Sequence, residues 1–256
     1  MTAEMRPRII VGISGASGVI YGIRALELLR ETGIETHLVM SKSAEMTMGY
    51  EVDIKPSGVR QLADVAYSNG DVGAAISSGS YRTNGMLVLP CSIRTMSEIA
   101  TGITSSLISR AADVVLKERR RLVLAVRETP LHTGHLRSLT QLSEMGALIS
   151  PIVPAFYTKP KTIDDIIDHS VGRLLDLFDL DVGAVTRWKE KEIARRLKDV
   201  AVIKAEEEAL VDDIRVASET GTVVSVAEAE AQALKLKSNA EKEELKSRAE
   251  GEAALY

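Results

Sequence analysis

The sequence predicts an α/β protein with a doubly wound, Rossmann- or flavodoxin-like parallel sheet flanked by helices, followed by a charged helical tail. Two observations predict this fold. Short, wholly apolar runs alternate with helix-like segments over the first three quarters of the chain, which is typical of a parallel sheet covered on both faces. The charge then changes, since residues 1–188 hold 20 basic and 20 acidic residues and residues 189–256 hold 12 and 16. We therefore expect a folded domain over 1–188 and a helical extension over 189–256.

Five apolar runs predict the strands of the sheet, and the periodic segments between them predict its helices. The predicted strands are Arg8–Ile13, Thr36–Met40, Met86–Pro90, Leu122–Val126 and Ala147–Ser150. The predicted helices are Val19–Glu31, one from about Ser43, Thr95–Arg110, His135–Met145 and one that begins after Thr162. Thr162 and Asp165 have the spacing of a capping box. The Gly- and Ser-rich stretch Ile76–Tyr81 predicts a flexible loop.

The tail has a different pattern. Apolar residues recur at helical spacing from Ile193 to Ile214, Thr220–Thr222 interrupts them, and the chain from Val226 onward is rich in Ala, Glu, Lys and Leu. Good helix formers at this density predict a long, solvated helix or a helical hairpin. A charged extension for assembly or solubility is favoured over a second active site.

Several classes of protein are excluded by the composition. No run of 18 apolar residues predicts a transmembrane helix, and Met1–Arg8 lacks the apolar core of a signal peptide. Cys91 is the only cysteine, which excludes a disulfide framework, and the spacing of His132 and His135 does not predict a metal site. A pI of about 5.7 without a basic stripe argues against a nucleic-acid partner. We expect a cytoplasmic protein.

The loop Gly12–Gly18 joins the first predicted strand to the first predicted helix. Backbone N–H groups and the helix dipole favour an anion at such a position, and Ser14 and Ser17 add hydroxyl donors. The glycine spacing differs from the dinucleotide fingerprint. A phosphate-binding loop and a tight turn without a ligand remain equally compatible with these residues.

Other chemistry-bearing residues follow the later strands. Pro90–Thr95 offers small polar groups to a ring or a phosphate, although Ser92 or Thr95 in a capped helix start explains them as well, and Cys91 is expected to be a buried thiol. Arg127 suits a phosphate or a flavin carbonyl, or pairs with Glu128. Tyr157 and Arg173 suit a phosphate monoester, or a packed ring and a solvated cation. Together these strand ends outline a pocket for a phosphorylated cofactor.

Six motifs resemble the flavin prenyltransferases, the UbiX-type proteins, over about residues 8–188. The motifs are Ile10–Gly18, Thr36–Lys42, Leu89–Thr95, Arg110–Arg119, Val126–His132 and Pro154–Tyr157. The resemblance implies transfer of a dimethylallyl group from dimethylallyl phosphate to N5 and C6 of reduced FMN, with no metal. The product, prenylated FMN, is implied to serve a separate UbiD-type decarboxylase, for example in ubiquinone biosynthesis. A homo-oligomer, namely a trimer-based dodecamer, is implied as well.

The same resemblance implies roles for particular residues. Ser17 and Glu51 match positions for proton handling and are the expected catalytic residues, whereas Tyr157 and Arg173 are expected to bind the prenyl phosphate. Trp188 matches a residue that helps to close the substrate site. The expected FMN-binding residues are Gly15, Ala16, Ser17, Ser41, Ser92, Ile93, Arg94, Thr95 and Arg127.

Two features depart from the family, and two other functions stay open. Some family members carry an acid where this chain has Arg137, so no catalytic acid is assigned there; Arg137 reaching a neighbouring subunit's phosphate is a hypothesis. The tail beyond Trp188 has no counterpart in the short family members. A flavin-dependent cysteine decarboxylase of related fold is the first alternative, although its Pro-x-Met-Asn-x-x-Met-Trp motif does not occur here. A non-catalytic flavin-binding scaffold is the second.

Overall fold

The structure, a computed structural model, describes residues 6–185, 187–188, 190–219 and 226–253. The chain forms two compact units, residues 1–185, which we call the body, and residues 186–256. The division between the two units falls after residue 185, three residues before the boundary predicted after residue 188. Trp188 belongs to the second unit, and the predicted interruption at Thr220–Thr222 lies outside the described residues. No helix of the described residues is both long and apolar enough to cross a membrane.

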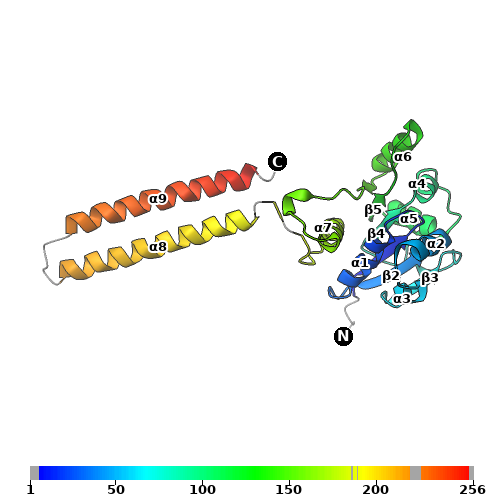
Figure 1. Ribbon diagram of the computed structural model, residues 1–256, viewed down its shortest axis with the longest axis horizontal. Coiled ribbons are helices and arrows are strands. Elements are labelled where there is room, and N and C mark those ends of the chain that lie inside the picture. Colours follow the sequence, from blue (N-terminus) through cyan, green and yellow to red (C-terminus); the bar gives the residue numbers. More distant parts are fainter. Residues whose placement is uncertain (1–5, 186, 189, 220–225, 254–256) are drawn as a thin grey trace. The chain divides into compact units, whose positions relative to one another are not determined.

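The body contains a six-stranded, wholly parallel sheet with the order β3-β2-β1-β4-β5-β6 (Figure 1). The predicted fold class is confirmed. The strands are β1 (Arg8–Ile13), β2 (Glu35–Met40), β3 (Val65–Ser68), β4 (Gly85–Cys91), β5 (Arg121–Val126) and β6 (Leu148–Ile149). The order reverses direction between β1 and β4, which leaves the loops after these two strands as neighbours at the carboxyl edge of the sheet.

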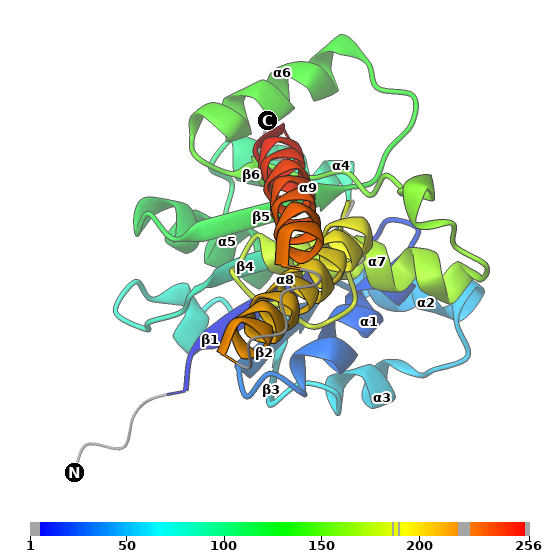
Figure 2. The same cartoon turned by 90° about the vertical axis from the view of Figure 1, so that its left-hand side faces the viewer.

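Helices cover both faces of this sheet because successive strand residues point to opposite sides. Ile9, Val11 and Ile13 pack with α1 (Val19–Leu29) and α7 (Ile163–Asp176), whereas Ile10 packs with α4 (Ile93–Ala100) and α5 (Leu107–Lys117). Figure 2 shows α1 and α7 on one side of the sheet and α5 on the other. The remaining elements of the body are α2 (Lys42–Glu51), α3 (Pro56–Arg60), α6 (Thr133–Glu144) and the short 3-10 helices η1 (Ala75–Ser77) and η2 (Phe156–Thr158).

Three predicted elements need correction. A sixth strand, β3, was not predicted, because its four residues alternate between half-buried and exposed at the edge of the sheet. The predicted helix Thr95–Arg110 is two helices, since the chain leaves α4 at Gly102 with φ +70° and Ser106 begins α5 with a capping box. The predicted loop Ile76–Tyr81 overlaps η1. The capping box of Thr162 and Asp165 is confirmed.

The second unit contains two long helices, α8 (Glu190–Glu219) and α9 (Val226–Ala253). They contact each other and run antiparallel, as Figure 1 shows. Among the described side chains of this unit, Val200 and Ala240 are the buried hydrophobic ones. The predicted charged helical tail is therefore confirmed, and it is a hairpin.

Candidate active site

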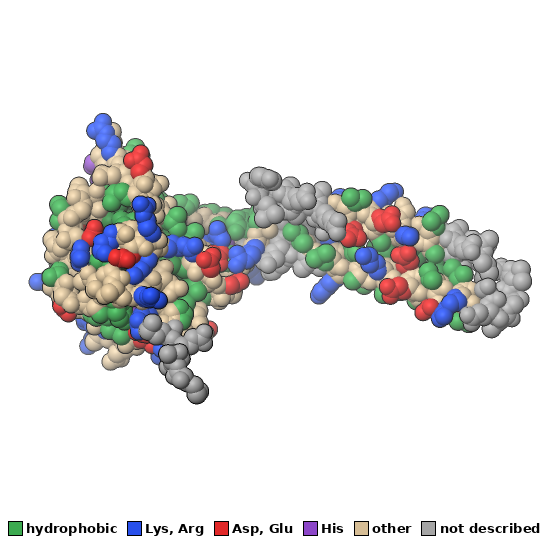
Figure 3. All heavy atoms as spheres, turned by 180° about the vertical axis from the view of Figure 1, so that it is seen from behind, with side chains coloured by type: hydrophobic (Ala, Val, Ile, Leu, Met, Phe, Trp, Pro, Cys, Tyr) green, Lys and Arg blue, Asp and Glu red, His purple; other side chains and the backbone are tan. Residues whose placement is uncertain are grey.

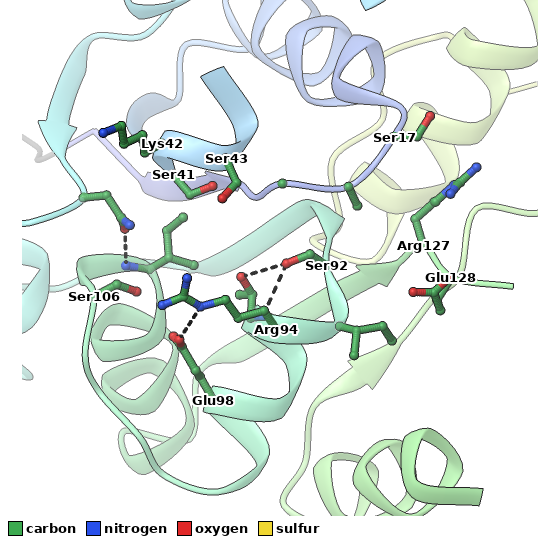
Figure 4. A pocket seen from close by; sticks show the side chains of 16 residues that line it. Ser17, Ser41, Lys42, Ser43, Ser92, Arg94, Glu98, Ser106, Arg127 and Glu128 are labelled. Atoms are coloured by element: carbon green, nitrogen blue, oxygen red, sulfur yellow. Dashed lines mark hydrogen bonds and ion pairs between the residues drawn. The ribbon is translucent and has the colours of Figure 1, made fainter. Parts of the chain in front are cut away.

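The loops that follow five neighbouring strands enclose a cavity of about 490 Å³ at the carboxyl edge of the sheet (Figure 4). We call it the larger cavity, because a smaller one lies beside β6. All nine residues expected to bind FMN line the larger cavity. Other lining residues were not predicted: Lys42, Ser43, Asn69, Glu98, Ser106, Ile108 and Glu128. Residues that stand up to 113 positions apart in the sequence are thus brought together, because parallel strands end at the same edge.

The first loop approaches the start of α2 too closely for any larger residue at Gly15. A Cβ built on Gly15 would lie 2.3 Å from the Cβ of Ser43. Gly18 takes φ +96° before α1 begins, a conformation that glycine adopts without steric cost. Gly15 lines the larger cavity, and Gly18 turns the chain from this loop into α1.

Glu51 occupies the N-terminus of α1, where the sequence predicted an anion. One oxygen of its carboxylate, Oε2, accepts hydrogen bonds from the backbone N–H of Gly18 at 2.8 Å and of Val19 at 3.0 Å. The helix dipole favours this placement of a negative charge. Two backbone N–H groups at this helix start are therefore satisfied by the chain's own carboxylate, and a phosphate-binding role for the rest of the loop stays a prediction. Glu51 is not among the lining residues of the larger cavity.

Ser14 links the loops after β1 and β4 rather than facing the cavity. Its hydroxyl donates to the carbonyl oxygen of Pro90 at 2.9 Å and accepts from the N–H of Ser92 at 2.7 Å. The side chain is fully buried. The expectation that Ser14 offers a hydroxyl to a ligand is therefore wrong, whereas Ser17 is exposed and lines the cavity.

Ser41 and Ser92 combine two tasks. Each is the N-cap of the helix that follows it, and each hydroxyl accepts from a backbone N–H, of Ala44 at 3.0 Å and of Thr95 at 3.3 Å. Both residues also line the larger cavity. The capped helix start, which the sequence left as one of two alternatives for Pro90–Thr95, is therefore present, and the same residues lie where the ligand-binding alternative requires them, along the cavity. Cys91 is fully buried, and burial raises the pKa of its thiol to about 12.

Cations outnumber carboxylates in the lining. Arg94 donates to Glu98 at 3.0 Å, and Lys42, Arg127 and Glu128 complete the charged set. The alternative pairing of Arg127 with Glu128 does not occur in the described part of the chain. In Figure 4 the guanidinium of Arg127 points toward the loop that carries Ser17. Hydroxyls, backbone N–H groups and an excess of one cation suit a planar ring that bears a phosphate.

A second, smaller cavity of about 230 Å³ follows β6 and contains the expected phosphate residues Tyr157 and Arg173. His169 lines the same cavity. It shares a hydrogen bond of 3.2 Å with the Tyr157 hydroxyl, and the two rings pack edge to face with centroids 5.7 Å apart. Arg173 donates to Asp176 at 2.6 Å, which fixes the guanidinium while most of its five N–H donors remain for a ligand.

Sequence reasoning missed His169, although a signal for it exists. His169 stands four residues before Arg173 in α7, and residues at this spacing share one face of a helix. Lys42 and Ser43 had a different signal, because they directly follow Ser41 in the sequence. Asn69 had none, because it follows the strand that was not predicted.

Three other predicted positions have different outcomes. His132 caps α6, since its Nδ1 accepts from the N–H of Gly134 at 3.0 Å. Arg137 is an exposed residue of α6. Trp188 belongs to the second unit and is 58% exposed, so its role in closing the site stays a prediction. The described residues contain no cluster of three His, Cys, Asp or Glu placed to hold a metal ion.

Comparison with known proteins identifies this arrangement. The family model described as Flavoprotein matches residues 2–175. The flavin prenyltransferase UbiX of Thauera aromatica is 56% identical over 191 residues, which are 73% of this chain and 98% of that protein. The chain belongs to the UbiX-type flavin prenyltransferases of the flavoprotein family.

Solved structures of UbiX-type proteins are similar as well. The crystal structure of AnUbiX (PadA1) in complex with FMN and dimethylallyl pyrophosphate is 55% identical, with a TM-score of 0.71, and covers 72% of this chain and 98% of its own. A dodecameric FMN-dependent UbiX-like decarboxylase from Escherichia coli O157:H7 is 48% identical, with a TM-score of 0.70, over 71% of this chain and 98% of its own. These UbiX-type proteins match almost entirely, yet part of this chain has no counterpart in them.

Proposed function

We propose that the body binds reduced FMN in the larger cavity and transfers a dimethylallyl group from dimethylallyl phosphate to N5 and C6 of the flavin. One observation carries this proposal. The nine residues that match FMN contacts of the family come from four loops and line the same cavity at the switch point of the sheet. Family membership and this convergence support the same ligand.

Tyr157, His169 and Arg173 hold the phosphate of the prenyl donor in this proposal. Reduced flavin supplies the electron-rich N5 and C6 atoms. As the bond from the allylic carbon to the phosphate oxygen breaks, negative charge grows on the phosphate. Fixed donors that face this charge stabilise the transition state more than the ground state. The carboxylate of Asp176 accepts from Arg173 at 2.6 Å, and the Tyr157 hydroxyl shares a hydrogen bond with His169, so both side chains are oriented before the reaction begins.

Ser17 and Glu51 handle protons near the flavin in this proposal. The hydroxyl of Ser17 is exposed beside the cavity, where it can donate to or accept from a bound ring. Glu51 is anchored by the two N–H groups of Gly18 and Val19. These hydrogen bonds fix the carboxylate of Glu51 beside Gly18, the residue that follows Ser17 in the sequence. We also propose that Trp188, three residues beyond the body, helps to close the substrate site.

The product, prenylated FMN, is proposed to pass to a separate UbiD-type decarboxylase in the cytoplasm. The proposed prenyltransferase domain covers 1–188, with 189–256 as its extension. A dodecamer is proposed for the assembly, because the E. coli O157:H7 protein that is 48% identical is described as dodecameric. Exposed hydrophobic side chains on the segment from Leu131 to Ile163 support contacts between subunits: Leu131, Leu136, Met145, Leu148, Val153, Phe156 and Ile163.

Arg173→Ala tests the assignment. The protein is mixed anaerobically with reduced FMN and dimethylallyl phosphate, and the mass of the flavin is measured. We expect the wild-type chain to add one C5H8 unit, and Arg173→Ala to lose transfer by about 10²-fold or more while FMN still binds. Arg30→Ala, at the end of α1 that lies at the opposite edge of the sheet, is the matched control. Full activity of Arg173→Ala would contradict the assignment.

The same assay separates the alternatives and the donors. An unchanged flavin together with decarboxylation of a cysteine peptide would indicate the cysteine decarboxylase. A bound but unaltered flavin in both assays would indicate a non-catalytic scaffold. Replacing dimethylallyl phosphate by dimethylallyl diphosphate in a parallel reaction shows which of the two donors the smaller cavity accepts.

A further inference from the structure

The hairpin uses one row of apolar residues to join its own two helices. The buried and half-buried hydrophobic residues of this seam are Val200, Ile203, Leu210 and Ile214 on α8, and Leu236 and Ala240 on α9. Their spacing of three, four or seven residues places them on one face of each helix. An ion pair of 3.5 Å between Lys204 and Glu244 also joins the two helices. These residues explain why α8 and α9 contact each other.

A second row on α8 remains exposed. We call it the Leu197 face; it consists of Leu197, Ala201, Lys204, Glu208, Val211 and Arg215. The spacing of 4, 3, 4, 3 and 4 residues is that of a coiled-coil face. Leu197 is 56% exposed and Val211 is 50% exposed. A shallow groove lies on the same side of α8, lined by Lys204, Glu207, Glu208, Val211 and Asp212. Figure 3 shows hydrophobic side chains among charged ones over the visible face of the hairpin.

The charges of α8 are separated along its length. Residues 190–204 hold five basic and three acidic residues, whereas residues 205–219 hold one basic and six acidic residues. A helix dipole favours the opposite arrangement, with acids near the N-terminus and bases near the C-terminus. In α9, the half that follows the turn, residues 226–239, holds two basic and two acidic residues. It therefore does not neutralise the acidic half of α8.

We propose that α8 pairs antiparallel with α8 of a second copy of this chain, through the Leu197 face. A two-fold axis that crosses the helix at residue 206 places Lys204 of each copy beside Glu208 of the other. The same axis places Ala201 beside Val211, and Leu197 beside the aliphatic stem of Arg215. Each contact occurs twice, as in an isologous dimer. The basic half of each α8 then faces the acidic half of the other.

The arrangement of charges excludes the parallel alternative. A parallel pair in register would place Lys204 beside Lys204 and Glu208 beside Glu208, and would bring the two acidic halves together. Like charges in contact oppose such a pair. The antiparallel pair converts the same residues into attractive contacts and covers Leu197 and Val211. This proposal does not depend on the flavin chemistry of the body.

Cysteine cross-linking of the full-length chain tests the pairing. Cys91, the only cysteine of the sequence, is fully buried. Disulfide-linked dimers therefore form only through the cysteines introduced on α8. The variant Ala201→Cys/Val211→Cys places two cysteines opposite each other only in the antiparallel pair. We expect it to form disulfide-linked dimers about ten-fold faster than Ala201→Cys or Val211→Cys alone, because those single cysteines lie about 15 Å apart along the axis. Equal rates for the double and single variants, or no cross-linking at all, would overturn the proposal.

A charge swap in the double-cysteine background tests the central contact. This background also carries Glu244→Gln, because Glu244 pairs with Lys204 inside the hairpin. Lys204→Glu or Glu208→Lys is then expected to slow cross-linking about three-fold, and the combination of the two is expected to restore the rate, because the pair is reformed with its signs exchanged. Lys198→Glu, on another face of α8, is the matched control for a change of charge. Circular dichroism checks that each variant keeps its helices. A combination that cross-links no faster than the single variants would also overturn the pairing.

Discussion

In the body, Val11 and Leu87 are fully buried between two layers of helices, whereas in the described part of the hairpin Val200 and Ala240 are the buried hydrophobic side chains. Packing against the sheet thus stabilises the helices of the body, and the ends of the strands fix the positions of its loops. The hairpin obtains its helices from good helix formers and one narrow seam. The difference teaches where a defined cavity can form, since only a packed framework fixes residues from several loops in place.

Loss of core packing is the largest effect that we expect. Leu87→Ala in β4 removes a fully buried side chain and is expected to lower the free energy of unfolding by about 2–5 kcal/mol. Leu234→Ala in α9 removes the same atoms from a side chain that is 71% exposed, and surface changes stay within about 0.5 kcal/mol. Urea unfolding of both variants measures the contrast. Similar losses for both would mean that the hairpin is packed as tightly as the body.

Ser14→Ala is expected to have the next largest effect. Removing its hydroxyl leaves the N–H of Ser92 without its acceptor at 2.7 Å, and an unsatisfied buried donor costs about 1–3 kcal/mol. Because the link joins two loops of the larger cavity, FMN affinity is expected to fall as well. Urea unfolding and fluorescence titration with FMN measure both changes. Ser57→Ala in α3 is the control, and an unchanged affinity would show that the loops keep their positions without this link.

A smaller, pH-dependent effect is expected at His37 of β2. Burial lowers its pKa, and Glu35 at 3.0 Å acts in the opposite direction. The folded chain therefore binds fewer protons than the unfolded chain, so stability is fully present above the unfolded pKa of about 6.5 and falls as the pH decreases from there toward the folded pKa. Unfolding curves between pH 7.5 and 5 are compared with those of His37→Gln, whose slope is expected to be shallower. Parallel slopes would contradict this reading of His37.

Deletion of residues 190–256 is expected to have the smallest effect on the body. The shortened chain keeps Trp188 and every residue that lines the two cavities. FMN affinity and the rate of prenyl transfer are expected to stay within about two-fold, as for sites without shared partners. A chain that no longer folds would show that the hairpin belongs to the core of the protein.

The sequence predicted the body best where burial is complete. After their first residues, β1, β2 and β5 are buried throughout, as is the whole of β4, and the ends of these four strands identified all nine lining residues expected to bind FMN. Where a strand is half-buried, as in Val65–Ser68, neither the strand nor Asn69 beyond it was predicted. The direction in which a polar side chain points could not be predicted from the sequence either. Ser14 contacts Pro90, 76 positions away, and Glu51 contacts Gly18, 33 positions away. Such contacts depend on the packed fold rather than on local pattern.

The link between Ser14 and the loop after β4 has a consequence for biosynthesis. The first loop of the flavin cavity emerges early from the ribosome, but its buried hydroxyl finds Pro90 and Ser92 only when β4 has been made. The cavity is complete only after Glu128, and the hairpin follows last. A nascent chain therefore gains its capacity for flavin only once at least half of its 256 residues have been made. Flavin capture by chains stalled at increasing lengths would report when the body becomes native.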